Sequence, residues 1–276
     1  MTLNCKGNLV DVSSPKVMGI LNITPDSFYD GGTLKSDADV LKRTEYMLEN
    51  GARFIDVGAY SSRPDAEHIS ANEEKQRLLP IIELLLTNFP EILISVDTFR
   101  SNIAEESINI GAAIINDISG GSMDDEMFET IGRLKVPYVL MHMQGTPQTM
   151  QKNPSYSNVV TDIRKNFSEK LLNLRALQLS DIILDVGFGF GKSIEHNYEL
   201  LSELHQFKTF DKPILAGISR KSMLYKTLNT SADKALNATS VANTIAIKNG
   251  ANILRVHDVK EASETIKICK MSGWCL

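Results

Sequence analysis

One local pattern repeats along nearly the whole sequence. A short apolar run ends in a polar residue and is followed by a stretch with helical periodicity, and we count eight such runs. Strands that alternate with helices favour a parallel sheet, and continuous apolar runs suit strands covered on both faces. The expected strands lie at residues 17–22, 54–57, 92–96, 113–115, 138–141, 181–187, 213–217 and 253–256.

Eight such units in a chain of 276 residues favour a TIM (β/α)8 barrel over an open doubly wound sheet. Residues 2–14 are typical of a short β-hairpin, which we expect to cap one end of the barrel. We expect residues 1–276 to form a single domain. In a barrel, every strand ends on the same face, so the polar residues that follow the strands should converge there.

Composition excludes several kinds of partner. The net charge of −5 offers no basic footprint for nucleic acid. No apolar run approaches about 18 residues, so we expect no membrane partner. The three cysteines follow no pattern, which favours a reducing compartment over a disulfide framework. We therefore expect a cytoplasmic protein.

The most distinctive stretch is residues 181–193, in which an apolar strand ends at Asp185 and three glycines alternate with aromatic residues. It fails the phosphate-binding P-loop pattern, because Val186 stands where glycine is required. It also fails the dinucleotide fingerprint, because Lys192 stands at the third glycine position. An ordinary strand-to-helix turn is the simplest alternative, but the same layout recurs at the other strand ends and favours a binding site.

The polar strand ends form a chemically mixed set. The residues expected to converge are Asn22, Asp97, Asn116, His142, Asp185, Lys221, Arg255 and His257. Two carboxylates, an amide and an ammonium (Asp97, Asp185, Asn116 and Lys221) suit the edge of a flat heterocycle that offers both donors and acceptors. The alternative for any single acid is that it caps the following helix.

Cationic residues near the same strand ends indicate an anion site. They are Arg63, Arg220, Arg255 and His257, and arginine is well suited to hold phosphate. His257 could equally be a buried structural histidine. The five histidines fit no zinc spacing. The loops at 22–35 and 58–71 are longer than usual and are candidate lids.

Many ordered segments resemble the dihydropteroate synthase family, and the resemblance extends from Val17 to Val259. The segments are 19–28 (Gly-Ile-Leu-Asn-Ile-Thr-Pro-Asp-Ser-Phe), 30–32, 56–58, 61–64 (Ser-Ser-Arg-Pro), 95–98, 116–121 (Asn-Asp-Ile-Ser-Gly-Gly), 141–147, 150–151, 185 with 189–192, 195–197, 219–222 (Ser-Arg-Lys-Ser) and 255–259. One segment alone would be a weak signal, but this number at compatible spacings is a strong one.

The resemblance implies a TIM barrel that condenses 6-hydroxymethyl-7,8-dihydropterin pyrophosphate with 4-aminobenzoate, giving 7,8-dihydropteroate and pyrophosphate with Mg²⁺. It also implies a homodimer and competition by sulfonamides. The pterin residues would be Asp97, Asn116, Met141, Asp185, Phe190, Gly217 and Lys221; the pyrophosphate residues Asn22, Ser62, Arg63, Arg255 and His257; and the aminobenzoate residues Phe28, Pro64, Phe190 and Ser222.

The implied catalytic residues are Asp97, Lys221, Arg255 and His257. We expect the C–O bond to break first, so that Asp97 stabilises a pterin cation before the amine attacks. Mg²⁺ carried by the pyrophosphate needs only one or two protein oxygens. Asn22 and Asp56 are the candidates for them.

Some positions depart from the family pattern: Ala59, Tyr60, Ser62 and Asp65 in the second long loop, Val186, and Tyr225. None of these changes removes a chemical role named above. Two other functions would share part of the pattern, a pterin-dependent methyltransferase and a non-catalytic pterin-binding paralogue. The methyltransferase has no need of the cations at 219–222 and 255–257, and the paralogue should have lost one of the charged strand ends.

Overall fold

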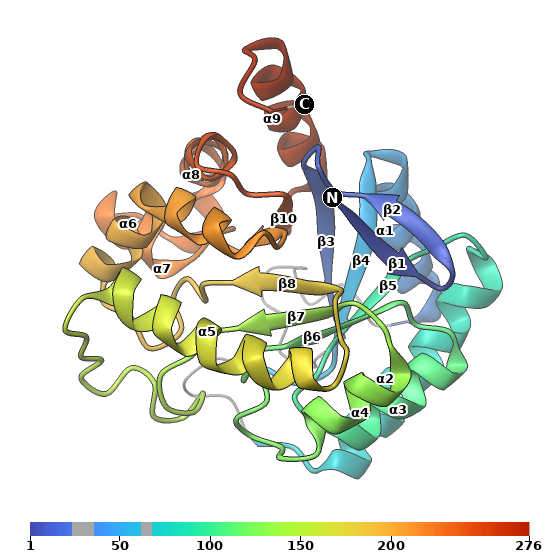
Figure 1. The fold of residues 1–276 in the computed structure, drawn as a ribbon. Coiled ribbons are helices and arrows are strands. Elements are labelled where there is room, and N and C mark those ends of the chain that lie inside the picture. Colours follow the sequence, from blue (N-terminus) through green and yellow to red (C-terminus); the bar gives the residue numbers. More distant parts are fainter. Residues whose placement is uncertain (24–35, 62–67, 276) are drawn as a thin grey trace.

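The protein is a closed parallel barrel surrounded by helices (Figure 1). The structure, a computed structural model, describes residues 1–23, 36–61 and 68–275. Within these ranges the barrel strands follow one another in the order β10, β3, β4, β5, β6, β7, β8 and β9. Their bounds are Lys16–Asn22 (β3), Ala52–Gly58 (β4), Ile94–Asp97 (β5), Ile114–Asp117 (β6), Tyr138–Met141 (β7), Ile182–Asp185 (β8), Ile214–Ala216 (β9) and Ile253–Val256 (β10). The predicted TIM barrel is confirmed.

Helices connect the strands and cover the outside of the barrel. They are α1 (Asp37–Glu49), α2 (Ala71–Asn88), α3 (Ser101–Ile110), α4 (Met127–Leu134), α5 (Val159–Ala176), α6 (Ile194–Ser202), η1 (Leu204–Phe210), α7 (Ser222–Thr227), η2 (Ala232–Lys234), α8 (Leu236–Lys248) and α9 (Val259–Met271). Several begin where the sequence offers a capping side chain: Ser36 accepts from the Asp39 amide, and Ser70 accepts from the Glu73 amide. None of the helices within the described ranges is long and apolar enough to cross a membrane.

The predicted N-terminal hairpin is also confirmed, and it closes the amino end of the barrel. Strands β1 (Thr2–Cys5) and β2 (Asn8–Asp11) pair antiparallel. Leu3 and Val10 of the hairpin join a buried cluster with Phe54 and other inward-facing residues from the beginnings of the barrel strands. The backbone amide of Asn4 donates to Asp181, 2.9 Å away. The hairpin is therefore an apolar plug at the end of the barrel opposite the polar strand ends.

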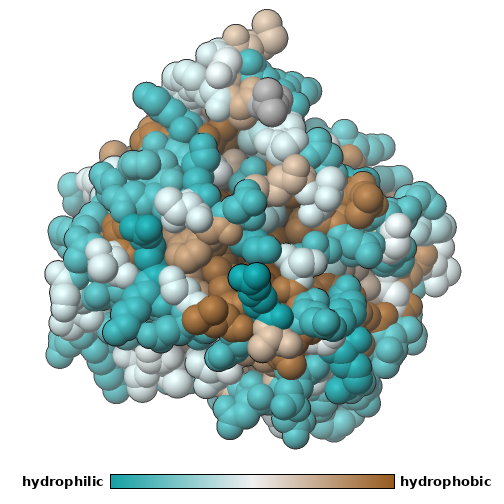
Figure 2. Space-filling view, in the orientation of Figure 1, coloured by the Kyte–Doolittle hydropathy of each residue, from teal (hydrophilic) through white to brown (hydrophobic). Residues whose placement is uncertain are grey.

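Alternation along each strand decides what the barrel interior contains. Residues Ile55 and Val57 of β4 belong to the large core between barrel and helices, whereas Phe54 belongs to the inner cluster at the amino end. Because successive side chains of a strand point to opposite faces, Asp56 points inward with Phe54. The interior thus changes from apolar at the hairpin to polar at the carboxyl end. Figure 2 shows that the outer surface seen from the hairpin side is mostly hydrophilic, with apolar side chains visible between.

A substitution at Phe54 tests how much the apolar plug contributes to the stability of the fold. It is fully buried within the inner cluster, so Phe54→Ala should lower the free energy of unfolding by about 3–5 kcal/mol through lost burial and a cavity. Urea denaturation measures this. Leu9→Ala in the same hairpin is the control, since Leu9 is 73% exposed and should change stability by less than about 0.5 kcal/mol. Equal losses in the two variants would contradict the plug.

Candidate active site

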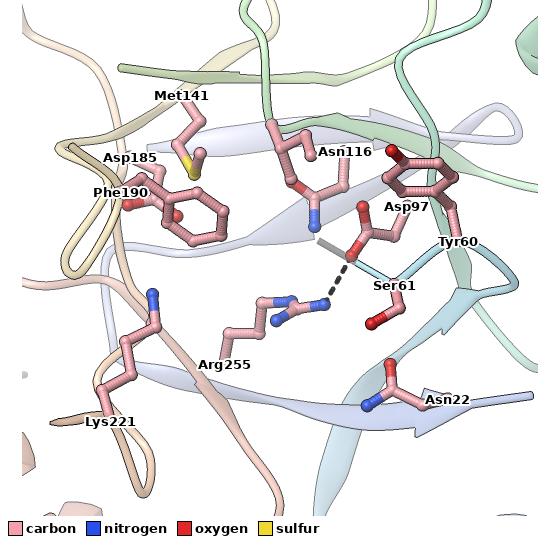
Figure 3. A pocket seen from close by; sticks show the side chains of 12 residues that line it. Asn22, Tyr60, Ser61, Asp97, Asn116, Met141, Asp185, Phe190, Lys221 and Arg255 are labelled. Carbon is pink, nitrogen blue, oxygen red and sulfur yellow. Dashed lines mark hydrogen bonds and ion pairs between the residues drawn. The ribbon is translucent and has the colours of Figure 1, made fainter. Parts of the chain in front are cut away.

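A polar pocket opens at the carboxyl end of the barrel (Figure 3). Its lining comes from nearly every strand end: Asn22, Tyr60, Ser61, Asp97, Asn116, Ile118, Met141, Asp185, Phe190, Gly217, Lys221 and Arg255. In Figure 3, Arg255 lies between two groups of side chains. Lys221, Asp185, Phe190 and Met141 lie on one side, and Tyr60, Ser61 and Asn22 lie on the other.

Arg255 connects two acids at the base of the pocket. Its Nε donates to Asp56 over 2.6 Å, and its Nη2 donates to Asp97 over 2.7 Å. The three residues belong to strands β10, β4 and β5, and Asp56 is completely buried. A second donor to Asp56 is the Asn116 amide, 3.0 Å away. This network fixes the guanidinium and the Asn116 side chain before any ligand binds.

The charges of this network do not balance. Two carboxylates share one guanidinium, so one negative charge remains when all three groups are ionised. Burial raises the pKa of Asp97 to about 7, although the positive charge of Arg255 acts in the opposite direction. The two acids hold the pKa of Arg255 above its ordinary value despite burial. The pocket therefore contains an acid that titrates near neutrality beside a cation that never titrates.

The other side of the pocket pairs an acid with a lysine. Burial raises the pKa of Asp185, and Lys221 opposes this shift. Burial also lowers the pKa of Lys221 to about 8. The Lys221 ammonium donates to the carbonyl of Phe188 and lies 4.6 Å from the centre of the Phe190 ring. A flat ligand beside Phe190 would meet both an acceptor and a donor here.

The glycine-rich segment after β8 is held by buried contacts. The Gly187 amide donates to the Asp185 carboxylate over 2.7 Å. The Lys192 ammonium, 4% exposed, donates to the Phe190 carbonyl over 2.9 Å and lies 3.1 Å from His142 Nδ1. A Cβ on Gly187 would stand 2.0 Å from the His142 carbonyl oxygen. Only glycine allows the chain to pass this close to the backbone that follows β7 and to present Phe190 to the pocket.

Most of the side chains predicted to converge do so. Of the converging strand ends, those that line the pocket are Asn22, Asp97, Asn116, Asp185, Lys221 and Arg255. Three residues implied by the family resemblance also line it: Met141, Phe190 and Gly217. Ser222 and His257 do not appear in the pocket lining, although each lies next to or near a residue that does. Phe28, Ser62, Arg63 and Pro64 lie outside the described residues. The roles assigned to all these side chains remain predictions.

Three expectations about individual side chains need correction. His257 is not a cation at neutral pH, because burial and the nearby Arg255 lower its pKa to about 3. Arg220 is paired with Asp258 through two contacts of 2.8 Å and does not line the pocket. His142 lies beneath the glycine segment against Lys192, and burial lowers its pKa to about 2. The position of a residue at the end of a predicted strand does not reveal whether its charge is paired or whether burial shifts its pKa.

The sequence patterns did not assign some lining residues. Tyr60, Ser61 and Ile118 line the pocket. The feature of the sequence that points to them is that each follows the end of a strand within three residues. For Asp56 the sequence suggests only a magnesium-binding role. In the structure its Oδ2 accepts from Arg255 and Asn116, while its Oδ1 is buried without a hydrogen-bond partner among the described residues. Its position two residues before the end of β4 was the signal, because it faces inward with the strand end.

Within the described ranges, no group of three His, Cys, Asp or Glu side chains could hold a metal ion. Both acids nearest Arg255 already form ion pairs with it. The Asn22 amide, at the pocket wall, offers one neutral oxygen. This donor set fits a Mg²⁺ ion held chiefly by a phosphate-bearing ligand, and does not fit a metal held by protein alone.

Fold and pocket together define a TIM-barrel protein with a site for a flat, polar ligand. A family model described as pterin binding enzyme matches residues 18–257. The dihydropteroate synthase of Escherichia coli (strain K12) is 43% identical over 270 residues, covering 97% of this chain and 95% of that protein. The chain belongs to the dihydropteroate synthase family of pterin-binding enzymes.

Solved structures agree with this assignment. The Yersinia pestis dihydropteroate synthase in a sulfonamide drug complex is 40% identical, with a TM-score of 0.94 and coverage of 99% of both chains. The Xanthomonas albilineans dihydropteroate synthase with 4-aminobenzoic acid is 32% identical, with a TM-score of 0.90, covering 99% of this chain and 98% of that chain. The resemblance seen in the sequence motifs is confirmed.

The close approach at Gly187 can be tested with a matched pair of glycines. Gly187 and Gly7 both have positive φ, +69° and +82°, but a Cβ on Gly7 would meet nothing within 4 Å. Gly7→Ala should therefore cost only the backbone strain, about 1 kcal/mol. Gly187→Ala should cost at least about 2 kcal/mol more than that, because the neighbouring atom is a backbone oxygen that cannot move freely. Urea denaturation of both variants measures the difference, and equal costs would contradict the role of this contact.

Proposed function

We propose that this protein condenses 6-hydroxymethyl-7,8-dihydropterin pyrophosphate with 4-aminobenzoate to form 7,8-dihydropteroate and pyrophosphate. The family assignment supports this activity. The main support from the structure is the arrangement around Arg255, whose guanidinium is fixed by two acids. Hydrogen-bond donors and acceptors suited to a heterocycle lie on one side of it, and the Asn22 amide lies on the other. The proposed enzyme is a transferase of folate biosynthesis and a target of sulfonamides.

The pterin ring would bind on the side of Lys221. Its amino and ring N–H groups match the carboxylate of Asp185 and the amide of Asn116, and its carbonyl oxygen and ring nitrogens match the donors. Phe190 and Met141 would supply apolar faces for the ring, and Gly217 leaves room beside it. Asp97 and Lys221 complete the set proposed for the pterin.

The pyrophosphate would extend past Arg255 to the side of Asn22. Ser62 and Arg63 would complete this anion site. His257 is neutral at physiological pH and would act through an N–H donor and not through charge. Mg²⁺ would be held by the pyrophosphate and the Asn22 amide, and when bound it would supply positive charge to the leaving group.

The 4-aminobenzoate would bind outside the pterin, bordered by Phe28, Pro64, Phe190 and Ser222. The Xanthomonas relative with 4-aminobenzoic acid and the Yersinia relative with a sulfonamide support this substrate and this class of inhibitor.

In the proposed mechanism, the C–O bond to pyrophosphate breaks first, and its electron pair leaves with the pyrophosphate oxygen. Arg255 and the His257 N–H hold the departing anion. A pterin cation remains, and Asp97 stabilises it because the acids around Arg255 carry an excess negative charge. The arylamine nitrogen then bonds to the carbon and loses a proton. Lys221 fixes the orientation of the ring.

We also infer that the chain is a single domain, cytoplasmic and homodimeric. Buried free thiols at Cys5 and Cys269 suit a reducing compartment. Apolar side chains on the neighbouring helices α8 and α9 support a dimer: Val241 is 53% exposed and Ile268 is 68% exposed. Light scattering of the purified protein measures the oligomeric state directly.

Pyrophosphate release tests the activity. The purified protein receives dihydropterin pyrophosphate and Mg²⁺, with or without 4-aminobenzoate. Release that depends on the amine and yields dihydropteroate is expected. Tight pterin binding without release would instead indicate a non-catalytic paralogue, and methyl transfer without release would indicate a methyltransferase.

Substitution of Asp97 should lower kcat far more than substitution of a residue at the edge of the site. We expect Asp97→Asn to lower kcat by about 100-fold or more, because it removes the charge that faces the cation. Ser222→Ala should lower kcat by less than about 10-fold. Steady-state kinetics compare the two variants. Similar losses in both would contradict the role of Asp97.

The rate should depend on pH in a bell shape. Asp97 carries its negative charge above a pKa of about 7, and Lys221 carries its positive charge below a pKa of about 8. We therefore expect kcat/KM to rise with pH through about 7 and to fall through about 8. Asp97→Asn should remove the rising limb, and Lys221→Arg should move the falling limb to higher pH. A profile that stays flat from pH 6 to 9 would contradict this assignment.

A further inference from the structure

The hydroxyl of Tyr60 connects two of the segments that follow barrel strands. It lies 3.0 Å from Nδ1 of His68, near the end of the segment between β4 and α2. It also accepts a hydrogen bond of 3.0 Å from the side-chain amide of Gln148, in the segment between β7 and α5. Tyr60 itself is 8% exposed and lines the pocket beside Ser61. One hydroxyl group thus joins residues 60, 68 and 148.

The ring of Tyr60 is fixed as firmly as its hydroxyl. It packs edge-to-face against Phe99, with the ring centres 5.0 Å apart, and the Arg100 guanidinium lies 5.7 Å from its centre. Arg100 is in turn ion-paired with the completely buried Glu74 and donates to the Ile69 carbonyl over 2.7 Å. These contacts hold Tyr60 and the His68 end of the loop to the same buried ion pair.

The hydrogen-bonding roles follow from the donors present. The Arg100 Nη2 lies 3.4 Å from Nε2 of His68, and a guanidinium can only donate. Nε2 therefore accepts, and a neutral imidazole carries its proton on Nδ1, which donates to the Tyr60 oxygen. The Tyr60 oxygen accepts from both His68 and Gln148.

We propose that Tyr60 is a positioning residue for the pyrophosphate end of the substrate. Its hydroxyl fixes the wall formed by Tyr60 and Ser61, which lies across Arg255 from Lys221, Asp185 and Phe190 (Figure 3). The inference rests on the proposed function, in which the pterin ring occupies the Lys221 side and the pyrophosphate extends toward Asn22. Loss of the hydroxyl should loosen the pyrophosphate side and leave the ring side unchanged.

This division predicts a selective defect in Tyr60→Phe, which keeps the ring and removes the two hydrogen bonds. KM for dihydropterin pyrophosphate should rise about 3- to 10-fold, while kcat changes by less than about twofold. The dissociation constant of 6-hydroxymethyl-7,8-dihydropterin, which lacks the pyrophosphate, should stay within about twofold when measured by calorimetry. A merely structural role would weaken both ligands together, and that outcome would overturn the proposal.

Tyr198→Phe is the matched control. The Tyr198 hydroxyl also makes one hydrogen bond, 3.1 Å to the Met223 carbonyl, but Tyr198 is 37% exposed and is not part of the pocket lining. Its KM for dihydropterin pyrophosphate should match that of the unaltered protein. Activity of the unaltered protein is measured first: if it forms no dihydropteroate, the proposed function fails. If the unaltered protein is active and Tyr60→Phe has an unchanged KM, the role of Tyr60 is refuted and the proposed function stands.

Variants of His68 and Gln148, the two hydrogen-bond partners of Tyr60, test the proposal further. Because His68 donates through Nδ1, His68→Asn keeps a donor near that position and should retain most of the normal KM, whereas His68→Leu should resemble Tyr60→Phe. Gln148→Leu should raise KM about 2- to 5-fold. Combined with Tyr60→Phe, it should add nothing further, since the shared bond is already lost. Multiplied defects in the double variant, or equal effects of His68→Asn and His68→Leu, would overturn the proposal.

Discussion

The ion pair of Arg255 with Asp56 and Asp97 is the interaction on which the rest of the site depends. Its members are far apart in the sequence and meet only because the barrel closes, with β10 beside β3 and β3 beside β4. Removing two carboxylates from water is costly, and a single guanidinium compensates only in part. The raised pKa of Asp97 reflects this imbalance. A cation formed next to Asp97, as in the proposed mechanism, would supply the missing charge.

Such an arrangement needs a rigid support, which the other end of the barrel provides. The hairpin and the apolar beginnings of the strands fill the amino end with a buried cluster that includes Phe54. The polar residues can then gather at the carboxyl end without weakening the whole interior. The same strand supplies both regions: along β4 the inward-facing side chains change from Phe54 to Asp56 to Gly58. Gly58 keeps space free beside Asp97, whose Cβ lies 3.2 Å from where a Cβ on Gly58 would stand.

The sequence was sufficient to predict the strands, their parallel arrangement and the charged and amide side chains of the pocket, because apolar runs and the polar residues that end them are local features. Met141, Phe190 and Gly217 were implied only by the family resemblance. The sequence was insufficient where a side chain's partner decides its role. Arg220 and His257 follow strands, and Arg255 lies just before the last residue of β10, so all three have similar positions in the sequence. Yet Arg220 is paired with Asp258, and burial makes His257 a neutral imidazole. The sequence suggests Asp56 as a possible metal ligand but does not reveal that its Oδ2 accepts from both Arg255 and Asn116. Charge state and pairing depend on distances between residues remote in sequence, which no local pattern encodes.

The two sides of the pocket differ in how they are built, and this bears on how the site can vary. The side of Asp185 and Lys221 includes strand ends and a glycine segment that packs against the backbone just after β7. One added methyl group at Gly187 would collide with that backbone. The side of Tyr60 and Ser61 consists of loop residues joined by side-chain hydrogen bonds to His68 and Gln148. Side-chain contacts can be exchanged for others without moving a strand, whereas backbone contacts cannot. The departures from the family pattern occur on both sides, at Ala59 and Tyr60 in the loop-built side and at Val186 beside Gly187 in the other. A change such as Val186 can therefore be accepted on the strand-built side as long as the glycine next to it is kept.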